Sequence, residues 1–189
     1  MSESIINLLE ICPDGCRTLG PGLRYVMWTQ GCPFNCKGCI SPEGRPVDAN
    51  KIVTVDALAA DIISRTELTG LTISGGEPFL QYKSLLELLR VVKQKRPEMD
   101  ILVFTGFTIE KLNWEGAIEI LGLIDVLIDG PYIPEMNDGV GLRGSSNQKI
   151  HFLTPRLLKY KEQMETGPRK VEMDIQQGYT RTIGIPLKN

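Results

Sequence analysis

The sequence lacks the features that would direct a chain to a membrane or to nucleic acid. No apolar stretch approaches the roughly 20 residues that span a bilayer, and the first residues contain no basic segment followed by an apolar core. The formal net charge of −2 provides no broad basic field for nucleic acid. We therefore expect a cytoplasmic protein that binds neither a membrane nor nucleic acid.

Internal repeats, low-complexity segments and a linker between domains are also absent, so the 189 residues suit a single domain. The chain is short for a complete eight-unit barrel, which favours a smaller α/β architecture. We expect residues 1–23 to form a turn-rich approach segment with little periodicity, and residues 165–189 to form a hairpin-like tail.

The five cysteines do not suit a disulfide framework, because their number is odd and three of them lie between residues 32 and 39. These three form a C-x3-C-x2-C loop, called the cysteine loop below. Three thiolates can hold a four-iron cluster that leaves one iron open to a small ligand. They also suit three ligands of a zinc site with a distant fourth ligand. Cys12 and Cys16 cannot complete a second four-cysteine site, and we expect partly buried thiols there.

Short apolar segments alternate with amphipathic ones, which is typical of a parallel sheet with right-handed helical crossovers. The predicted strands cover residues 24–30, 71–73, 101–104, 124–128 and 149–153. The predicted helices cover residues 55–63, 80–95, 109–121 and 155–164. Thr54 is the expected N-cap of the first helix, and Gly116 is expected to interrupt the third. A hairpin over residues 171–185 is expected to turn near Gly178.

Polar and glycine-rich segments follow these predicted strands. The cysteine loop follows the first strand, and Gly75 and Gly76 follow the second, where they allow the backbone to pass close to a ligand. Thr105 and Asp129 follow the third and fourth strands. Because the carboxyl ends of parallel strands meet at one edge, we expect these four segments to form one site.

The cysteine loop together with Ser74-Gly75-Gly76-Glu77-Pro78 resembles the radical S-adenosylmethionine (SAM) enzymes. The resemblance implies an α/β fold, namely a partial (β/α) barrel of the radical SAM type with a mostly parallel sheet. It also implies a 4Fe-4S cluster that binds SAM and, on reduction, releases a 5′-deoxyadenosyl radical. The implied cluster ligands are Cys32, Cys36 and Cys39, and the implied SAM-binding residues are Ser74, Gly75, Gly76, Glu77, Thr105 and Asp129. No catalytic side chain is implied beyond the cluster and SAM.

Three of the ionisable residues have simpler explanations that stay open. Glu77 also suits an acid at a helix N-terminus, where the helix dipole stabilises it. Asp129 precedes Gly-Pro and also suits a turn-forming residue. His151 is the only histidine, and its place between apolar residues of a predicted strand favours a structural role.

Within this superfamily the chain most resembles the activating proteins of anaerobic ribonucleotide reductase. The segments that carry this resemblance are Gly20-Pro21-Gly22-Leu23-Arg24, Gly31-Cys32-Pro33, Ser74 to Gln81, Thr105-Gly106-Phe107-Thr108, Asp129-Gly130-Pro131-Tyr132 and Leu142 to Gln148. The resemblance implies that the radical takes a hydrogen atom from a glycine of a partner reductase. It further implies an external electron donor such as flavodoxin or ferredoxin, and anaerobic conditions. Residues 142–148, with Arg143, are a candidate docking loop for the partner.

Some features depart from this pattern and keep other functions open. Gly38 stands where many radical SAM enzymes place an aromatic residue, and neither Cys12, Cys16 nor the tail matches the activating proteins. A maturase of a ribosomally made peptide is therefore an alternative substrate class. A non-catalytic metal-binding or electron-transfer protein is an alternative of a different kind.

Overall fold

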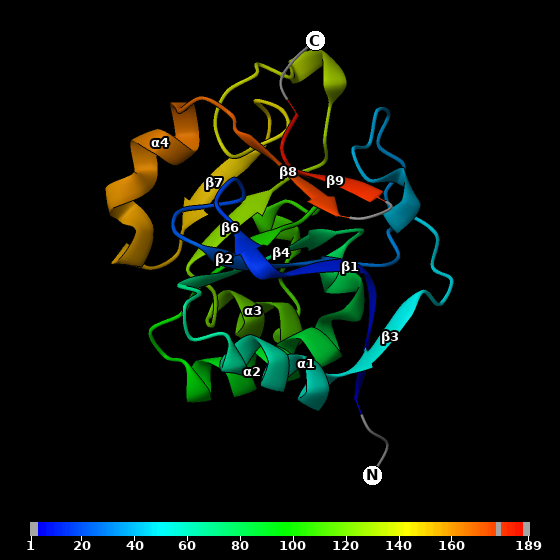
Figure 1. Ribbon diagram of the computed structural model, residues 1–189. Helices are drawn as coiled ribbons and strands as arrows, with labels where there is room; N and C mark the ends of the chain where they lie inside the picture. Colours follow the sequence, from blue (N-terminus) through cyan, green and yellow to red (C-terminus); the bar gives the residue numbers. More distant parts are fainter. Residues whose placement is uncertain (1–3, 177–178, 187–189) are drawn as a thin grey trace.

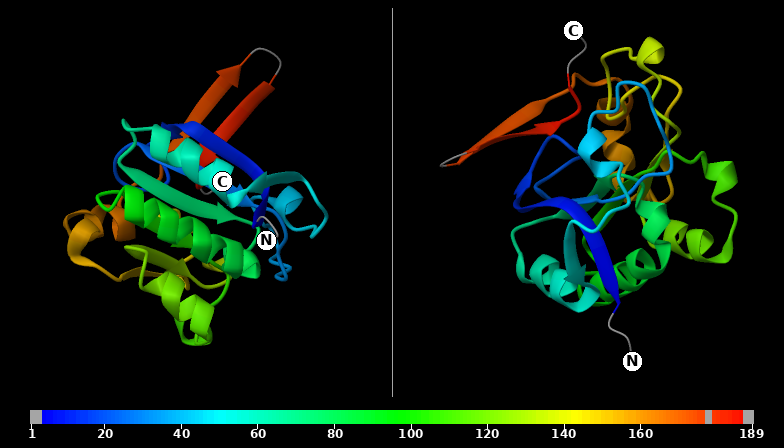
Figure 2. Two further views of the ribbon diagram at one scale, coloured as in Figure 1. Left: turned by 90° about the horizontal axis from the view of Figure 1, so that it is seen from below. Right: turned by 90° about the vertical axis from the view of Figure 1, so that its right-hand side faces the viewer.

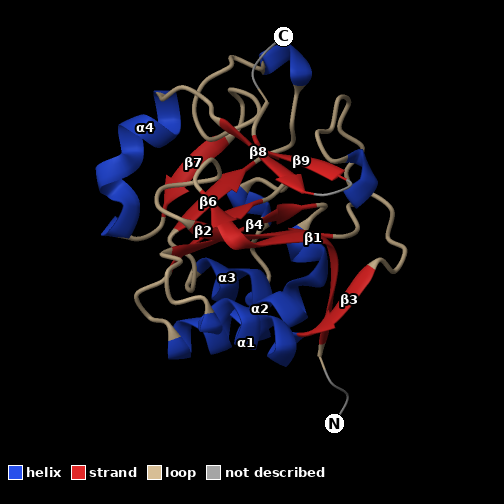
Figure 3. Ribbon diagram, in the orientation of Figure 1, coloured by secondary structure: helices blue, strands red, loops and turns tan. Residues whose placement is uncertain are grey.

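A computed structural model describes residues 4–176 and 179–186 and shows a mixed α/β fold (Figures 1 and 3). The strands of the main sheet are β1 Ile5–Cys16, β2 Arg24–Thr29, β3 Lys51–Thr54, β4 Gly70–Gly75, β5 Asp100–Phe104, β6 Val126–Asp129 and β7 Lys149–Phe152. The helices are α1 Val55–Ser64, α2 Tyr82–Lys95, α3 Glu115–Leu121 and α4 Lys161–Thr166. The strands β8 Val171–Gln176 and β9 Tyr179–Gly184 form a separate hairpin. Single 3-10 turns or short 3-10 helices cover Pro42–Gly44, Pro78–Gln81, Ile109–Lys111, Pro134–Met136 and Pro155–Tyr160.

The main sheet has the strand order β3-β1-β2-β4-β5-β6-β7. Its four central strands, β2, β4, β5 and β6, run parallel, and Met27, Ile73, Val103 and Leu127 form one row across them. The other three strands pair antiparallel: β1 lies between β2 and the edge strand β3, and β7 forms the opposite edge beside β6. All four parallel strands therefore present their carboxyl ends at the same edge of the sheet.

Helices α1, α2 and α3 cover one face of this sheet (Figures 1 and 2). Helix α1 begins where the Thr54 side chain accepts a hydrogen bond from the Ala57 backbone, as expected of an N-cap. In α2 the leucines and Val92 recur at helical spacing and are buried against the sheet, whereas most of the polar positions are exposed. Each such leucine or valine contributes about 1.5–3 kcal/mol when fully buried. This layer leaves the opposite face of the sheet available for a site.

A buried ion pair joins the amino ends of the parallel strands. The Arg24 guanidinium pairs with Asp100 and also donates to the Thr72 hydroxyl and to backbone carbonyls of residues 21 and 71. The Arg24 side chain is fully buried, so these acceptors compensate for its lost hydration. Gly20 and Gly70 leave the space that this side chain fills.

The predicted parallel strands and the helices predicted at residues 55–63 and 80–95 are confirmed, but the expectation of an irregular segment at residues 1–23 is wrong. Most of this segment is the long strand β1, which pairs with both β2 and β3. Register shifts between Leu8 and Glu10 and between Cys12 and Cys16 break the period of two that normally reveals a strand. Strand β3 was also missed, because it is only four residues long and mostly not buried.

Two predicted helices differ from the structure. Residues 109–121 form a 3-10 turn and then α3, and Gly116 lies inside α3 against the Tyr82 ring and does not interrupt it. Residues 155–160 are 3-10 helix, so α4 begins only at residue 161. The hairpin is confirmed, whereas Gly178 lies outside the described residues. Closure of the sheet into a partial barrel stays a prediction. Among the described helices, none combines the length and apolar character that crossing a membrane requires.

Candidate functional site

A large cavity lies at the carboxyl edge of the parallel strands and has a volume of about 890 Å³. The cysteine loop, the Gly75-Gly76 turn and Thr105 all border it, together with the loop after β6. Predicted site residues that line the cavity are Cys32, Cys36, Cys39, Ser74, Gly75, Gly76 and Thr105. Glu77 and Asp129 are not among its lining residues. The structure thus brings together the segments that the sequence placed at one edge, but separates two acids from the cavity surface.

Backbone hydrogen bonds hold the cysteine loop to the segment that follows it. The Gly31 N–H donates to the Gly44 carbonyl over 2.8 Å, and the Cys32 N–H donates to the Arg45 carbonyl over 3.0 Å. Farther along, the Phe34 ring packs edge-on against Phe107, with 5.0 Å between the ring centroids. The loop is therefore positioned by protein contacts at its start and its middle.

The three thiols of the loop are partly exposed and face the cavity. Burial raises the pKa of the Cys32 thiol, and nearby Glu77 and the other two thiols act in the same direction. A bound metal centre reverses this effect, because a coordinating thiol loses its proton outright. In the described part of the chain, no three His, Cys, Asp or Glu side chains converge on the position of a single metal ion. Three soft thiolate donors beside so large a space fit an iron–sulfur cluster with a further ligand.

The glycines at the end of β4 are required by the packing of the protein backbone. Gly75 has φ +110°, and a Cβ there would lie 2.3 Å from the Thr29 nitrogen. A Cβ on Gly76 would lie 2.2 Å from the Gly31 carbonyl oxygen and 2.6 Å from that of Gly44. The sequence argument assigned the space of the missing Cβ atoms to a ligand, whereas in the structure this space is filled by the backbone of β2 and of Gly31 and Gly44, which flank the cysteine loop. Contact between the glycine backbone and a ligand stays a prediction.

Glu77 is completely buried and links three segments of the site. One carboxylate oxygen accepts hydrogen bonds from the Thr105 hydroxyl at 2.8 Å and the Phe79 N–H at 3.0 Å, and the other accepts from the Gly106 N–H at 2.8 Å. Its own N–H donates to the Gly31 carbonyl over 2.8 Å.

Burial raises the pKa of Glu77 to about 7, although all three donors favour its charged form. Its bond to Phe79 caps the 3-10 turn that follows, which agrees with the simpler explanation as an N-terminal acid. Sequence reasoning missed the links to Thr105 and Gly106, because they depend on tertiary contacts.

Asp129 is also buried and is engaged by the protein. It accepts hydrogen bonds from the Ile109 N–H at 2.7 Å and the Lys149 N–H at 3.2 Å. The His151 Nε2 lies 3.0 Å from Asp129 Oδ2, but without the alignment of a hydrogen bond. Asp129 thus fixes the end of β6 to two neighbouring segments, and a direct role for it in ligand binding stays a prediction.

Many polar groups of the loop after β6 are used inside the loop. The Gln148 side chain donates to the Gly130 carbonyl and accepts from the Gly144 and Ser145 backbone. Arg143 forms an ion pair with Asp138, with 2.8 Å between the atoms. These bonds shape the cavity wall, and docking of a partner on residues 142–148 stays a prediction.

Arg169 is a functional candidate that the sequence did not reveal. Its buried side chain donates to Asn137, to the carbonyls of Arg143 and Gly144, and to the carbonyl of Pro186. It therefore connects the loop after β6 to the end of the chain that follows the hairpin. Sequence reasoning could not distinguish Arg169 from the other arginines, because most of its acceptors are backbone carbonyls, which no sequence motif marks.

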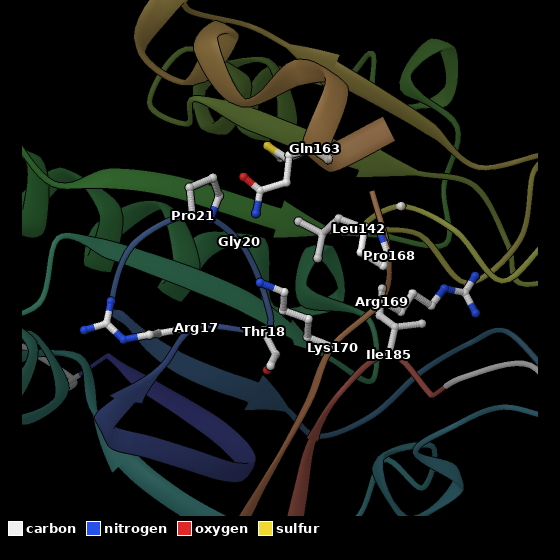
Figure 4. A pocket seen from close by; sticks show the side chains of 12 residues that line it. Arg17, Thr18, Gly20, Pro21, Leu142, Gln163, Pro168, Arg169, Lys170 and Ile185 are labelled. Atoms are coloured by element: carbon white, nitrogen blue, oxygen red, sulfur yellow. The ribbon is translucent and has the colours of Figure 1, made fainter. Parts of the chain in front are cut away.

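A smaller cavity of about 50 Å³ lies beside Arg169, between the β1–β2 connection and the start of β8 (Figure 4). Figure 4 shows the ends of Lys170 and Gln163 pointing toward one another, whereas the guanidinium groups of Arg17 and Arg169 point away. None of the residues predicted to bind the cluster or SAM lines this cavity.

Comparisons with known proteins agree with this geometry. The model of a family described as a 4Fe-4S single cluster domain matches residues 18–151. A protein of Vibrio cholerae serotype O1 is 36% identical over 142 residues, which are 71% of this chain and 91% of that protein. One of Escherichia coli K12 is 32% identical with the same coverage, and one of Enterobacteria phage T4 is 30% identical over 75% of this chain and 91% of its own. All three are named anaerobic ribonucleoside-triphosphate reductase-activating protein.

Proposed function

Because the chain belongs to the family of anaerobic ribonucleoside-triphosphate reductase-activating proteins, we propose that it is a radical SAM enzyme that generates a glycyl radical in an anaerobic ribonucleotide reductase. The observation that carries this proposal is the convergence of the cysteine loop and the Gly75-Gly76 turn on one large cavity. The match to a 4Fe-4S family model supports a cluster at these cysteines over the zinc site that their spacing alone left open.

Cys32, Cys36 and Cys39 hold the cluster from one side of the cavity. The cluster held there would pass one electron to bound SAM, whose carbon–sulfur bond would break to give methionine and a 5′-deoxyadenosyl radical. The backbone of Ser74, Gly75 and Gly76 and the Thr105 side chain lie where they can orient SAM. Glu77 acts through its neighbours, because it fixes Thr105 and the Gly106 backbone relative to the cysteine loop.

The finer features of the proposal follow from the same relatives and from the fold. The domain is a single radical SAM unit whose sheet forms a partial (β/α) barrel. An external donor such as flavodoxin or ferredoxin supplies the electron, and the protein works in the cytoplasm under anaerobic conditions. The relatives' names favour the reductase over a small peptide as the substrate, and an electron-transfer protein has no need of so large a cavity.

Anaerobic reconstitution followed by electron paramagnetic resonance tests this function. We expect about four iron atoms per chain, cleavage of SAM to 5′-deoxyadenosine on reduction, and a glycyl-type doublet when the reductase is present. A cluster that cleaves SAM without giving this doublet would exclude the reductase as substrate. Modification of a co-encoded peptide under the same conditions would instead support the maturase.

A further inference from the structure

The β8–β9 hairpin is an addition to the family domain, since the matching family model ends at residue 151. Figure 2 shows the hairpin projecting from the rest of the molecule. It nevertheless borders the large cavity through Thr180, Arg181 and Thr182. A chain segment that lies outside the family domain but forms a wall of its cavity is placed to influence what enters.

The two faces of the hairpin differ in character. On the inner face, Ile183 is 3% exposed and packs in a cluster with Cys12, Cys16 and Val26. Hydrogen bonds also connect this face to the segment after β1: the Arg17 N–H donates to the Glu172 carboxylate, and the Thr18 hydroxyl donates to the Ile183 carbonyl. The inner face is therefore fixed to the body of the protein.

The outer face carries an exposed apolar stripe. Side chains of Val171, Met173 and Ile175 alternate along β8, and their residues are 38%, 65% and 73% exposed. Met173 pairs with Thr182 and Ile175 pairs with Thr180, so these four side chains share one face of the hairpin. We call Val171, Met173, Ile175, Thr180 and Thr182 the hairpin face.

The hairpin face is continuous with the wall of the reaction cavity. Thr180 and Thr182 belong both to this face and to the cavity lining. Ile40, just after the cysteine loop, also lines the cavity and is 59% exposed. The apolar residues Met173 and Ile175 therefore lie directly beside the threonines that line the cavity, and the five residues of the hairpin face include no charged side chain. Exposed apolar patches of this kind mark sites of protein interaction.

We propose that the hairpin face binds an uncharged, apolar polypeptide segment of the partner reductase, next to the glycine that enters the cavity. This inference rests on the proposed function, because that function requires a protein backbone to reach the cluster and SAM. Met173 and Ile175 do not line the cavity, whereas their cross-strand partners Thr182 and Thr180 do, so the stripe suits a polypeptide that continues beyond its reacting residue. A small substrate lying inside the cavity would not cover Met173 and Ile175.

The test compares a double variant, Met173→Thr with Ile175→Thr, with the control Ile118→Thr. Ile118 serves as the control because it is an apolar residue of α3 that is 56% exposed. Threonine is chosen as the replacement because it favours β-strands and so should preserve the hairpin. The reconstituted proteins are first assayed for SAM cleavage without the reductase, where both variants should match the unsubstituted protein. Glycyl radical formation is then measured against reductase concentration.

The expected result is a rise of roughly 10-fold or more in the apparent KM for the reductase in the double variant, a change that corresponds to about 1.4 kcal/mol. The control should stay within about 2-fold. An unchanged KM in the double variant would overturn the proposal, as would a changed oligomeric state without a changed KM, which would indicate a second copy as the occupant. Failure of the unsubstituted protein to produce any glycyl radical would instead refute the proposed function, and the inference with it.

Cross-linking provides a second measurement that does not depend on the variant's kinetics. A photoreactive p-benzoylphenylalanine at position 173 should cross-link to the purified reductase in the segment that flanks the radical glycine. The same group at position 118 should not. Cross-links from position 173 to a distant part of the reductase, or none at all, would overturn the proposal.

Discussion

Glu77→Gln tests how the site tolerates a buried acid. The pKa of Glu77 is raised from 4.5 to about 7, so the folded protein holds the proton more tightly than the unfolded chain does. The tighter binding of this proton stabilises the folded protein. This contribution to the free energy of unfolding is complete below pH 4.5 and is lost as the pH rises toward 7. At about 1.36 kcal/mol for each unit of pKa, the whole loss is roughly 3 kcal/mol, of which about 2 kcal/mol falls between pH 5.5 and pH 8.

Glutamine has nearly the same shape as glutamate but does not titrate, so the variant should lack this part of the pH dependence. Thermal unfolding of the anaerobic protein measures the effect, since 1 kcal/mol shifts the midpoint by about 2–4 °C for a chain of this size. At pH 5.5 the carboxyl of Glu77 is protonated but keeps two oxygens that can accept hydrogen bonds, whereas the amide nitrogen of glutamine accepts none. Glutamine should therefore be the poorer residue at this pH, by about 1–3 kcal/mol. The midpoint of the variant should then rise relative to the unsubstituted protein by about 4–8 °C between pH 5.5 and 8.

Glu87→Gln on the exposed side of α2 serves as the control, in which this relative shift should not occur. A midpoint difference between Glu77→Gln and the unsubstituted protein that stays constant over the pH range would refute the reasoning. It would mean that the three hydrogen bonds to Glu77 outweigh the cost of its burial.

Three further predictions concern the cluster, the glycine turn and the buried ion pair. Replacing all three cysteines of the cysteine loop by alanine should abolish the cluster, and full retention of iron and of SAM cleavage would contradict the ligand assignment. Gly76→Val should lower both iron content and SAM binding, because the valine side chain would displace Gly31. Calorimetry and iron analysis on the folded variant distinguish this combined loss from a loss of SAM binding alone. Asp100→Asn should destabilise the protein by roughly 3–5 kcal/mol, measured by chemical denaturation, because it leaves the Arg24 charge buried and unpaired. A loss below about 1 kcal/mol would show that the carbonyl acceptors suffice.

The central strands could be predicted because each is a short run of apolar residues, and α1 and α2 could be predicted because their apolar residues recur at helical spacing. Strand β1 could not, since its bulges break the period of two of a strand and its pairing depends on strands distant in sequence. The meeting of four segments at one edge followed from the topology of parallel strands. The detailed roles of Glu77 and Asp129 did not follow, because sequence spacing does not show whether a carboxylate points to a cavity or to backbone N–H groups.

The backbone contacts among Gly31, Gly44 and Gly76 bear on what happens to the protein when oxygen destroys the cluster. The Gly31–Gly44 and Gly31–Glu77 hydrogen bonds, together with the close approach of Gly76, hold the start of the cysteine loop without any contribution from metal. Oxidative loss of the cluster should therefore leave a folded chain with its thiols still presented at the cavity.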